Sequence, residues 1–245
     1  MVDDVVPYKF IKPKLYHGFI VAARRFEPMY RSTMGGMLTI VAVAVVFLIL
    51  AFSEYLSRYR GVHSELTRKI VHILVGIFVA FWPFFLSWRQ IQTLSLLFLV
   101  AVLISLKLNI FSSVHGINRR SMGEVLFAVV IGVLAFIVTS KWVFAAAMLH
   151  LSIADGLAAV VGLAYGERNS YRIMGRTKSL AGSLAFFFAS VAIMVWYVSF
   201  SGADASAVTV LWLPVVATFA ENISGEGTDN LVIPLLVALV LTSSL

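Results

Sequence analysis

An aspartate stands inside a long apolar segment of this sequence. Asp155 lies in "HLSIADGLAAVVGLAYG", residues 150–166, which belongs to a run long enough to cross a bilayer as a helix. On insertion scales, a carboxylate at the centre of such a helix costs about 2.5–3.5 kcal/mol. Ionisable residues inside membranes usually face a protein interior and carry function. We therefore expect Asp155 to face the protein interior and to have a function.

Small residues accompany Asp155 and lead into a basic loop. Gly156 follows at once, and Gly162-x-x-x-Gly166 is a pattern that usually means close packing between helices. The next loop ends in "GRTKSLAGS", residues 175–183, where a serine can cap a helix and a lysine stands beside its N-terminus. A helix N-terminus with a lysine attracts phosphate. The residues concerned are Lys178, Ser179 and Gly182, and Gly182 lets another backbone come close.

A second set of polar residues recurs at helical spacing in "ELTRKIVHILVG", residues 65–76. Spacings of three and four residues place them on one stripe of a helix. The stripe consists of Glu65, Arg68, Lys69, His72 and Gly76. Basic side chains reaching towards lipid headgroups explain Arg68 and Lys69, but not His72, which lies one turn deeper. The alternative is that the stripe binds a phosphate chain, with His72 as hydrogen-bond donor or proton acceptor.

Two further motifs precede apolar runs. In "NRRSMGEVLF", residues 118–127, Ser121 and Glu124 have the spacing of a capping box, and Arg120 stands just before the predicted helix, where arginines bind phosphate. In "ENISGEGTDNLVIP", residues 221–234, a glycine-containing loop supplies several oxygen ligands. Such ligands suit Mg²⁺, which takes one or two carboxylates plus substrate phosphates, although an ordinary acidic loop would look the same. These ligands are Glu221, Glu226, Asp229 and Asn230.

The elements that must position these residues are membrane helices. The chain is 60% hydrophobic and 13% charged, with a mean hydropathy of +0.95, whereas soluble domains carry about 25% charged residues. The sequence predicts an all-α integral membrane protein, a polytopic bundle of about eight transmembrane helices. Residues 1–33 are predicted to form a basic interfacial arm, and residues 34–245 a single polytopic membrane catalytic domain. The predicted spans are Met34–Leu56, Leu66–Leu86, Ile91–Leu108, Glu124–Ser140, Trp142–Tyr165, Leu180–Phe200, Ala205–Asn222 and Leu231–Leu245.

The polar residues between these spans fall mainly on one membrane face, because the loops after odd-numbered spans are long and charged. That face carries eleven Lys and Arg residues, and the other face eight, six of them in the N-terminal arm. The positive-inside rule favours a cytoplasmic position for the polar loops, although it then places the basic arm outside. The net charge is +7, and most of the basic residues flank apolar spans. They therefore indicate contacts with lipid headgroups or phosphates, not with nucleic acid. The chain has no cysteine, which excludes thiolate chemistry.

One membrane face thus gathers basic residues at helix starts together with several carboxylates. This combination suits phosphoryl transfer between a water-soluble donor and a lipid alcohol. The four motifs, in this order and from about residue 64 to 236, resemble the membrane family of CTP-dependent lipid kinases. This family comprises phytol kinase, dolichol kinase and the CTP-using diacylglycerol kinase, and CDP-diacylglycerol synthases share part of the pattern. Dolichol kinases and the synthases commonly have a glutamate where this chain has Ala181, so "KSLAGS" looks more like phytol kinase and the diacylglycerol kinase.

The resemblance implies a kinase that uses CTP and Mg²⁺ to phosphorylate phytol, a polyprenol or diacylglycerol. It implies that Asp155 and Asp229 are metal ligands or the catalytic base. It further implies Glu221 as a metal ligand, with Glu124 and His72 in support of catalysis. The glycines of these motifs would let backbone approach the nucleotide. The residues expected to bind the nucleotide are Arg68, Lys69, Arg120, Gly156, Gly162, Lys178, Ser179, Gly182 and Asn230.

Two alternatives stay open at this point. A cytidylyltransferase would use the same nucleotide and metal, but it would form a CDP-lipid and release pyrophosphate. A small-solute transporter would place its charges near the midplane in repeat-related helices, whereas here they gather towards one face and no repeat is visible. The sequence leaves open the lipid alcohol, the donor nucleotide, the base and the oligomeric state.

Overall fold

The computed structural model describes residues 34–56, 64–108, 122–203, 207–225 and 227–243. The chain divides into two units, Met1–Ala42 and Val43–Leu245, and the second unit contains all of the polar motifs. The predicted interfacial arm, residues 1–33, lies outside the described residues. The prediction of one catalytic domain from residue 34 onward stays a prediction.

Apolar helices occupy all eight places where spans are predicted. Five are long and apolar enough to cross a membrane, and three shorter apolar helices lie at the remaining places. The prediction of an all-α membrane protein is therefore confirmed. The long helices are Met34–Leu56, Leu66–Phe84, Trp88–Leu108, Lys141–Tyr165 and Leu180–Ser201, and the shorter ones are Gly123–Ile137, Thr209–Ile223 and Asp229–Ser243. The labelled elements are α2 (Ser64–Ala80), η1 (Trp82–Phe84), α3 (Trp88–Leu108), α5 (Gly123–Ile137), α6 (Lys141–Leu149), η2 (His150–Ala154), α7 (Asp155–Tyr165), η3 (Glu167–Asn169), β1 (Ser170–Ile173), β2 (Arg176–Ser179), α8 (Leu180–Ser201), α9 (Ala207–Ile223) and α10 (Asp229–Ser243).

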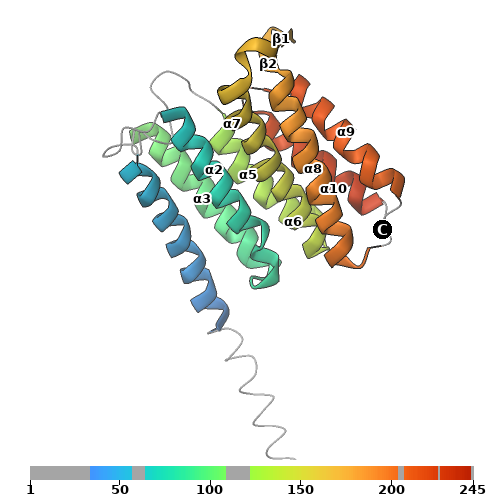
Figure 1. Ribbon diagram of the computed structural model, residues 1–245. Helices are drawn as coiled ribbons and strands as arrows, with labels where there is room; N and C mark the ends of the chain where they lie inside the picture. Colours follow the sequence, from blue (N-terminus) through green and yellow to red (C-terminus); the bar gives the residue numbers. More distant parts are fainter. Residues whose placement is uncertain (1–33, 57–63, 109–121, 204–206, 226, 244–245) are drawn as a thin grey trace, which may run out of the picture. The chain divides into compact units, whose positions relative to one another are not determined.

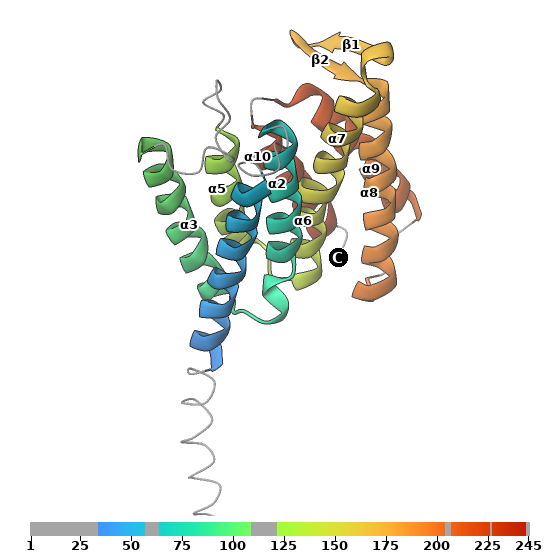
Figure 2. The same cartoon turned by 60° about the vertical axis from the view of Figure 1, so that its left-hand side comes forward.

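The predicted span Trp142–Tyr165 is interrupted in its middle by a turn of π-helix. It consists of α6, the π-helical segment η2 and α7, which follow one another without a loop. This segment is the centre of the bundle, since α2, α8 and α10 all pack against α6 and η2 (Figures 1 and 2). Three consecutive alanines, residues 145–147, are fully buried in α6, and their small side chains let the surrounding helices come close.

Glycines set the distances between α2, α7 and α8. A Cβ atom on Gly76 of α2 would lie 2.4 Å from Ser152 Cβ, and a Cβ atom on Gly156 would lie 2.3 Å from Ile73 of α2. On α8, a Cβ atom on Gly182 would lie 2.8 Å from the Ala158 carbonyl oxygen of α7. These helices therefore pack at distances that larger side chains would not allow.

The loop between α7 and α8 contains a small β-hairpin, where the sequence predicts only a polar loop. Strands β1 and β2 pair antiparallel, and the turn between them is Met174–Gly175. Both turn residues have positive φ, 50° and 76°, as the tight turns favoured in two-residue hairpins require. The hairpin extends beyond the ends of α7 and α8 in both views (Figures 1 and 2). Ser179 then caps α8, because its hydroxyl accepts a hydrogen bond from the Gly182 N–H at 3.1 Å, which confirms the predicted cap.

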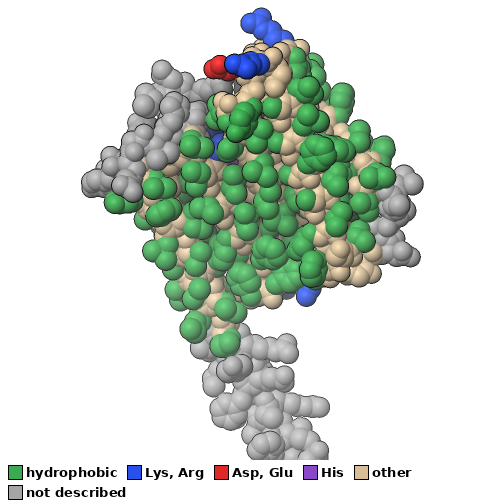
Figure 3. Space-filling model, in the orientation of Figure 1, with side chains coloured by type: hydrophobic (Ala, Val, Ile, Leu, Met, Phe, Trp, Pro, Cys, Tyr) green, Lys and Arg blue, Asp and Glu red, His purple; other side chains and the backbone are tan. Residues whose placement is uncertain are grey.

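The surface separates into apolar and charged zones. On the face shown in Figure 3, hydrophobic side chains cover the sides of the helices, and most of the charged side chains in view lie at the hairpin end. Arg168 and Arg172 are exposed there. This distribution fits a bilayer around the helices with the hairpin at or beyond the headgroup level.

Candidate active site

Asp155 has its counterion on a neighbouring helix. Lys69 Nζ of α2 donates to Asp155 Oδ2 at 3.1 Å, and the carboxylate is buried, with 4% of the residue exposed. His72 Nε2 lies 3.9 Å from the same oxygen and 3.1 Å from the Leu151 carbonyl oxygen. Because a carbonyl can only accept, Nε2 carries the proton of this hydrogen bond. The predicted stripe of α2 therefore does face Asp155, with Lys69 and His72 as its contact residues.

The π-helical turn η2 sets the direction in which Asp155 points. In an α-helix, 3.6 residues make one turn, and this period fixes the face on which each side chain lies. A π-helical turn contains more residues, so it changes the face on which the residues after it lie. Asp155 is the first residue after η2. Turns of this kind often occur at functional sites. No feature of the apolar sequence before Asp155 indicates it.

Buried hydrogen bonds hold η2 in place. His150 Nδ1 donates to the Ala146 carbonyl oxygen at 2.8 Å, and His150 Nε2 accepts from the Ser190 hydroxyl of α8 at 2.8 Å. Ser152 donates to the Met148 carbonyl oxygen at 2.8 Å. His150, Ser152 and Ser190 are all fully buried. The segment before Asp155 is thus tied both to its own helix and to α8.

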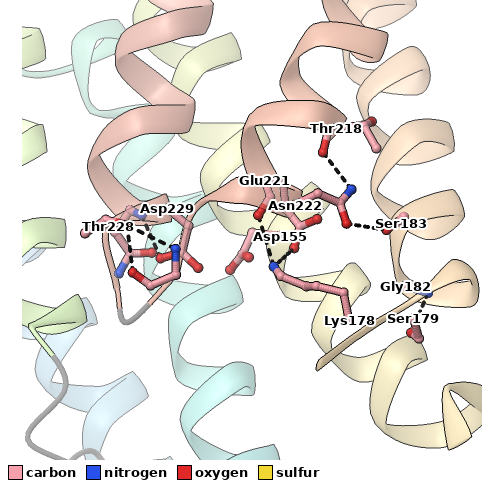
Figure 4. A network of polar contacts seen from close by, with 12 residues as sticks. Asp155, Lys178, Ser179, Gly182, Ser183, Thr218, Glu221, Asn222, Thr228 and Asp229 are labelled. Atoms are coloured by element: carbon pink, nitrogen blue, oxygen red, sulfur yellow. Dashed lines mark hydrogen bonds and ion pairs between the residues drawn. The ribbon is translucent and has the colours of Figure 1, made fainter. Parts of the chain in front are cut away.

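A second ion pair, which is partly buried, joins the hairpin to α9. Lys178 Nζ, on β2, pairs with the Glu221 carboxylate and donates to the Glu221 carbonyl oxygen at 3.0 Å (Figure 4). Glu221 is 5% exposed and lies in the last turn of α9. The Lys178 ammonium therefore interacts with both the Glu221 carboxylate and the partially negative C-terminus of α9.

Asp229 and Asn230 open α10 beside these pairs. Asp229 Oδ1 accepts from the Asn230 backbone N–H at 2.9 Å, and Asn230 Nδ2 donates to the Gly123 carbonyl oxygen at 2.8 Å, which joins α10 to α5. The charges of Asp155, Lys69 and Lys178 all act on Asp229. In Figure 4, Asp155 lies between Asp229 and the Lys178 side chain. Three carboxylates and two lysines from α2, α7, β2, α9 and α10 thus form one cluster.

Arg68 and Glu124 extend the cluster towards α5. Arg68 Nη1 lies 3.9 Å from Glu124 Oε1, and Glu124 is in the first turn of α5. Met122 is the N-cap residue of α5, and the predicted capping box stays a prediction because its serine is not among the described residues. Arg120 and Ser121 lie outside the described residues.

The glycines of the predicted nucleotide site have packing partners in the structure. Gly156 faces Ile73, Gly162 lies near Ser179, and Gly182 faces α7. Close helix packing is sufficient to explain these three glycines. Their approach to a nucleotide stays a prediction.

The donor set fits Mg²⁺ bound jointly by protein and substrate. Among the residues that the structure describes, no three His, Asp or Glu side chains are grouped so as to hold a metal ion by themselves. Mg²⁺ does not need such a group, because it usually takes one or two carboxylates and completes its shell with phosphate oxygens and water. Asp155 is buried and Asp229 is partly buried, and their charges act on each other, a situation that a shared cation relieves.

Sequence reasoning missed a group of hydrogen bonds beside Lys178. The Tyr171 hydroxyl, on β1, contacts Ser183 Oγ at 2.7 Å and donates to Asn222 Oδ1. Ser183 Oγ also lies 3.0 Å from Asn222 Oδ1. No local signal indicates this group, because the partners of Tyr171 lie 12 and 51 positions away in the chain.

The chain is similar in sequence to several known proteins. No protein-family model and no solved structure matches the chain. The chain is 33% identical to a phytol kinase of Synechocystis sp., over 82% of this chain and 89% of that protein. It is 30% identical to a chloroplastic farnesol kinase of Arabidopsis thaliana, over 81% of this chain and 72% of that protein. It is also 30% identical to a probable chloroplastic phytol kinase 2 of Oryza sativa subsp. japonica, over 82% and 73% of the two chains.

Proposed function

The chain belongs to the family of lipid-alcohol kinases that includes phytol kinase and farnesol kinase, and from this premise we propose that it transfers the γ-phosphoryl group of CTP to an isoprenoid alcohol. One observation carries the assignment to this site. The buried pair of Asp155 and Lys69 stands beside Asp229 and Lys178, at the end of apolar helices long enough to hold a lipid tail. Charged groups that meet a phosphate chain and an apolar surface that meets a lipid are both needed for this reaction.

The basic residues bind the triphosphate. Lys178 stands immediately before the N-terminus of α8, where unpaired backbone N–H groups and the helix dipole add to its charge. Lys69 and Arg68 approach from α2. In this arrangement each lysine exchanges a carboxylate partner for a phosphate oxygen when the nucleotide binds. The positive charges then stabilise the negative charge that builds up on the transferred phosphoryl group.

Carboxylates supply the remaining chemistry. Asp155 and Asp229 would hold Mg²⁺, which, when bound, neutralises the phosphates and fixes their position. Glu221 is a third candidate ligand, but its ion pair with Lys178 must open before it can reach a metal. Asp155 or Asp229 takes the proton of the alcohol as its oxygen attacks the γ-phosphorus and CDP leaves. His72 is held by its hydrogen bond to the Leu151 carbonyl oxygen and lies beside Asp155, where it would position a phosphate or the alcohol hydroxyl.

The charged end of the bundle faces the cytoplasm in this proposal, since CTP is supplied there. The chain has no cysteine, so single cysteines can report the two ends of the bundle separately. Arg172→Cys, on the hairpin, should react with a membrane-impermeant maleimide from the cytoplasmic side. Lys141→Cys, at the start of α6, should react only from the other side. The reverse labelling pattern would overturn the orientation.

Product analysis tests the reaction. Purified protein is incubated with Mg²⁺, one of the four ribonucleoside triphosphates, and phytol, farnesol, a polyprenol or diacylglycerol, and the products are identified by mass. A phosphorylated isoprenoid alcohol and CDP are expected. A CDP-lipid with pyrophosphate would instead identify a cytidylyltransferase. The absence of turnover with all donors and acceptors would refute the proposed reaction.

A further inference from the structure

The hairpin is attached to the end of α9 at two neighbouring points. On β1, the Tyr171 hydroxyl bonds to Asn222, and on β2, Lys178 pairs with Glu221. Tyr171 and Lys178 are directly opposite each other in the strand register, and Glu221 and Asn222 are consecutive. The contact that orients Lys178 and the contact made by Tyr171 therefore belong to one small assembly.

The Tyr171 contact is a node of three oxygens that share two protons. Asn222 Oδ1 can only accept, while the hydroxyls of Tyr171 and Ser183 each have one proton to donate. The orientation of the Asn222 amide is fixed from its other end, because Nδ2 donates to the Thr218 carbonyl oxygen at 2.9 Å (Figure 4). Asn222 is buried, so its oxygen would lose its partners without gaining water if Tyr171 and Ser183 were removed. The node thus has a defined geometry that joins β1, α8 and α9.

We propose that Tyr171 is a positioning residue of the kinase, which fixes the hairpin through Asn222 and Ser183 so that Lys178 is held ready for the phosphates of the nucleotide. This inference rests on the proposed function. A lysine ammonium is a point charge on a flexible four-carbon chain, so the position of its charge depends on the backbone that carries it. Among the described residues, the short strand that carries Lys178 makes its ladder contacts with β1 alone, and the node fixes β1 directly opposite Lys178. Holding the charge in advance lowers the entropy lost when phosphate binds.

Steady-state kinetics test this role. Tyr171→Phe keeps the ring and removes the hydroxyl, and Ser183→Ala removes the second donor from the other side. Each variant should raise the KM for the nucleotide at least fivefold, while kcat and the KM for the lipid alcohol change by less than twofold. Tyr165→Phe is the matched control, because Tyr165 is exposed at the end of α7, and its constants should equal those of the wild type. An unchanged nucleotide KM in both node variants would overturn the proposal.

A double variant separates an effect through Lys178 from an independent one. If Tyr171 acts through Lys178, Tyr171→Phe should raise the nucleotide KM no further in a Lys178→Met background. Equal fold-changes in the two backgrounds would show that Tyr171 acts by another route and would overturn the proposal.

Limited trypsin digestion measures the attachment of the hairpin without any turnover. Arg172 and Arg176 are tryptic sites within the hairpin. Tyr171→Phe should increase the rate of cleavage there at least threefold in the absence of nucleotide, and Tyr165→Phe should not. Because cleavage does not depend on phosphoryl transfer, a wild-type enzyme without kinase activity would refute the proposed function alone. An unchanged cleavage rate in Tyr171→Phe would refute the attachment.

Discussion

Lys69 and Asp155 stand 86 positions apart in the chain and meet in the interior, with Lys69 Nζ 3.1 Å from Asp155 Oδ2. This pair explains how an apolar helix tolerates a carboxylate. The Lys69 ammonium lies against the Asp155 carboxylate and compensates its negative charge, and the Lys178 ammonium also acts on it. In the proposed function, a metal ion would replace the ammonium group at this carboxylate.

Asp155→Asn keeps the size of the side chain and removes its charge. Loss of a catalytic base or metal ligand should lower kcat/KM by at least roughly 100-fold. The measurement is product formation by mass spectrometry, together with gel filtration to show that the variant is folded. Glu167→Gln is the control, since Glu167 is an exposed acid just before the hairpin, and its activity should stay within twofold of the wild type. Near-normal turnover in Asp155→Asn would leave Asp155 a purely structural role.

The dependence on Mg²⁺ distinguishes the roles of Asp229 and Glu221. Asp229→Asn should raise the Mg²⁺ concentration that gives half-maximal activity by at least roughly tenfold, because a ligand is lost. Glu221→Gln should change this concentration much less, since Lys178 already occupies the Glu221 carboxylate, and should mainly raise the KM for the nucleotide. Equal shifts in the two variants would make Glu221 a direct metal ligand.

Gly182→Ala tests the close approach of α7 and α8. The added methyl group would lie 2.8 Å from the Ala158 carbonyl oxygen and 3.0 Å from Ser179 Oγ, so the helices must separate. Overpacking of this kind costs about 1–3 kcal/mol, and the free energy of unfolding in mixed micelles should fall by that amount. The control is Gly36→Ala, where a Cβ atom has nothing within 4 Å and should not lower stability. Equal stability of the two variants would show that α8 can move away from α7 without loss.

Much of this arrangement is predictable from sequence, because it depends on local rules. Long apolar runs give the helices, and the three- and four-residue spacing of Lys69 and His72 places both on the face of α2 that meets Asp155. Ser179 caps α8 as its position before an apolar run predicts.

The remaining features depend on contacts between distant parts of the chain. The π-helical turn is stabilised by His150 and Ser190, 40 positions apart, and nothing in the local sequence distinguishes it from an α-helix. The ion pair of Glu124 with Arg68 joins two helices, so the local sequence around Glu124 does not indicate it. Likewise, the pairing of Tyr171 with Asn222 becomes visible only when α9 and the hairpin are packed together.

Ser190→Ala tests whether the His150 hydrogen bond holds the π-helical turn. The change leaves His150 Nε2 buried without the hydroxyl that donates to it. Hydrogen bonds between membrane helices contribute about 0.6 kcal/mol on average and up to about 1.7 kcal/mol, so the free energy of unfolding should decrease by an amount in this range. Ser199→Ala on the same helix is the control. Its hydroxyl is exposed and bonds only to the Val195 carbonyl oxygen of its own helix, so stability should change by less than about 0.5 kcal/mol. Asp155 is the first residue after the π-helical turn, so a change in the turn would move its carboxylate. Ser190→Ala should therefore also lower kcat, whereas Ser199→Ala should not. A stable and fully active Ser190→Ala variant would show that the turn does not need the Ser190 hydrogen bond and is held by the bonds of His150 and Ser152 to α6 together with packing.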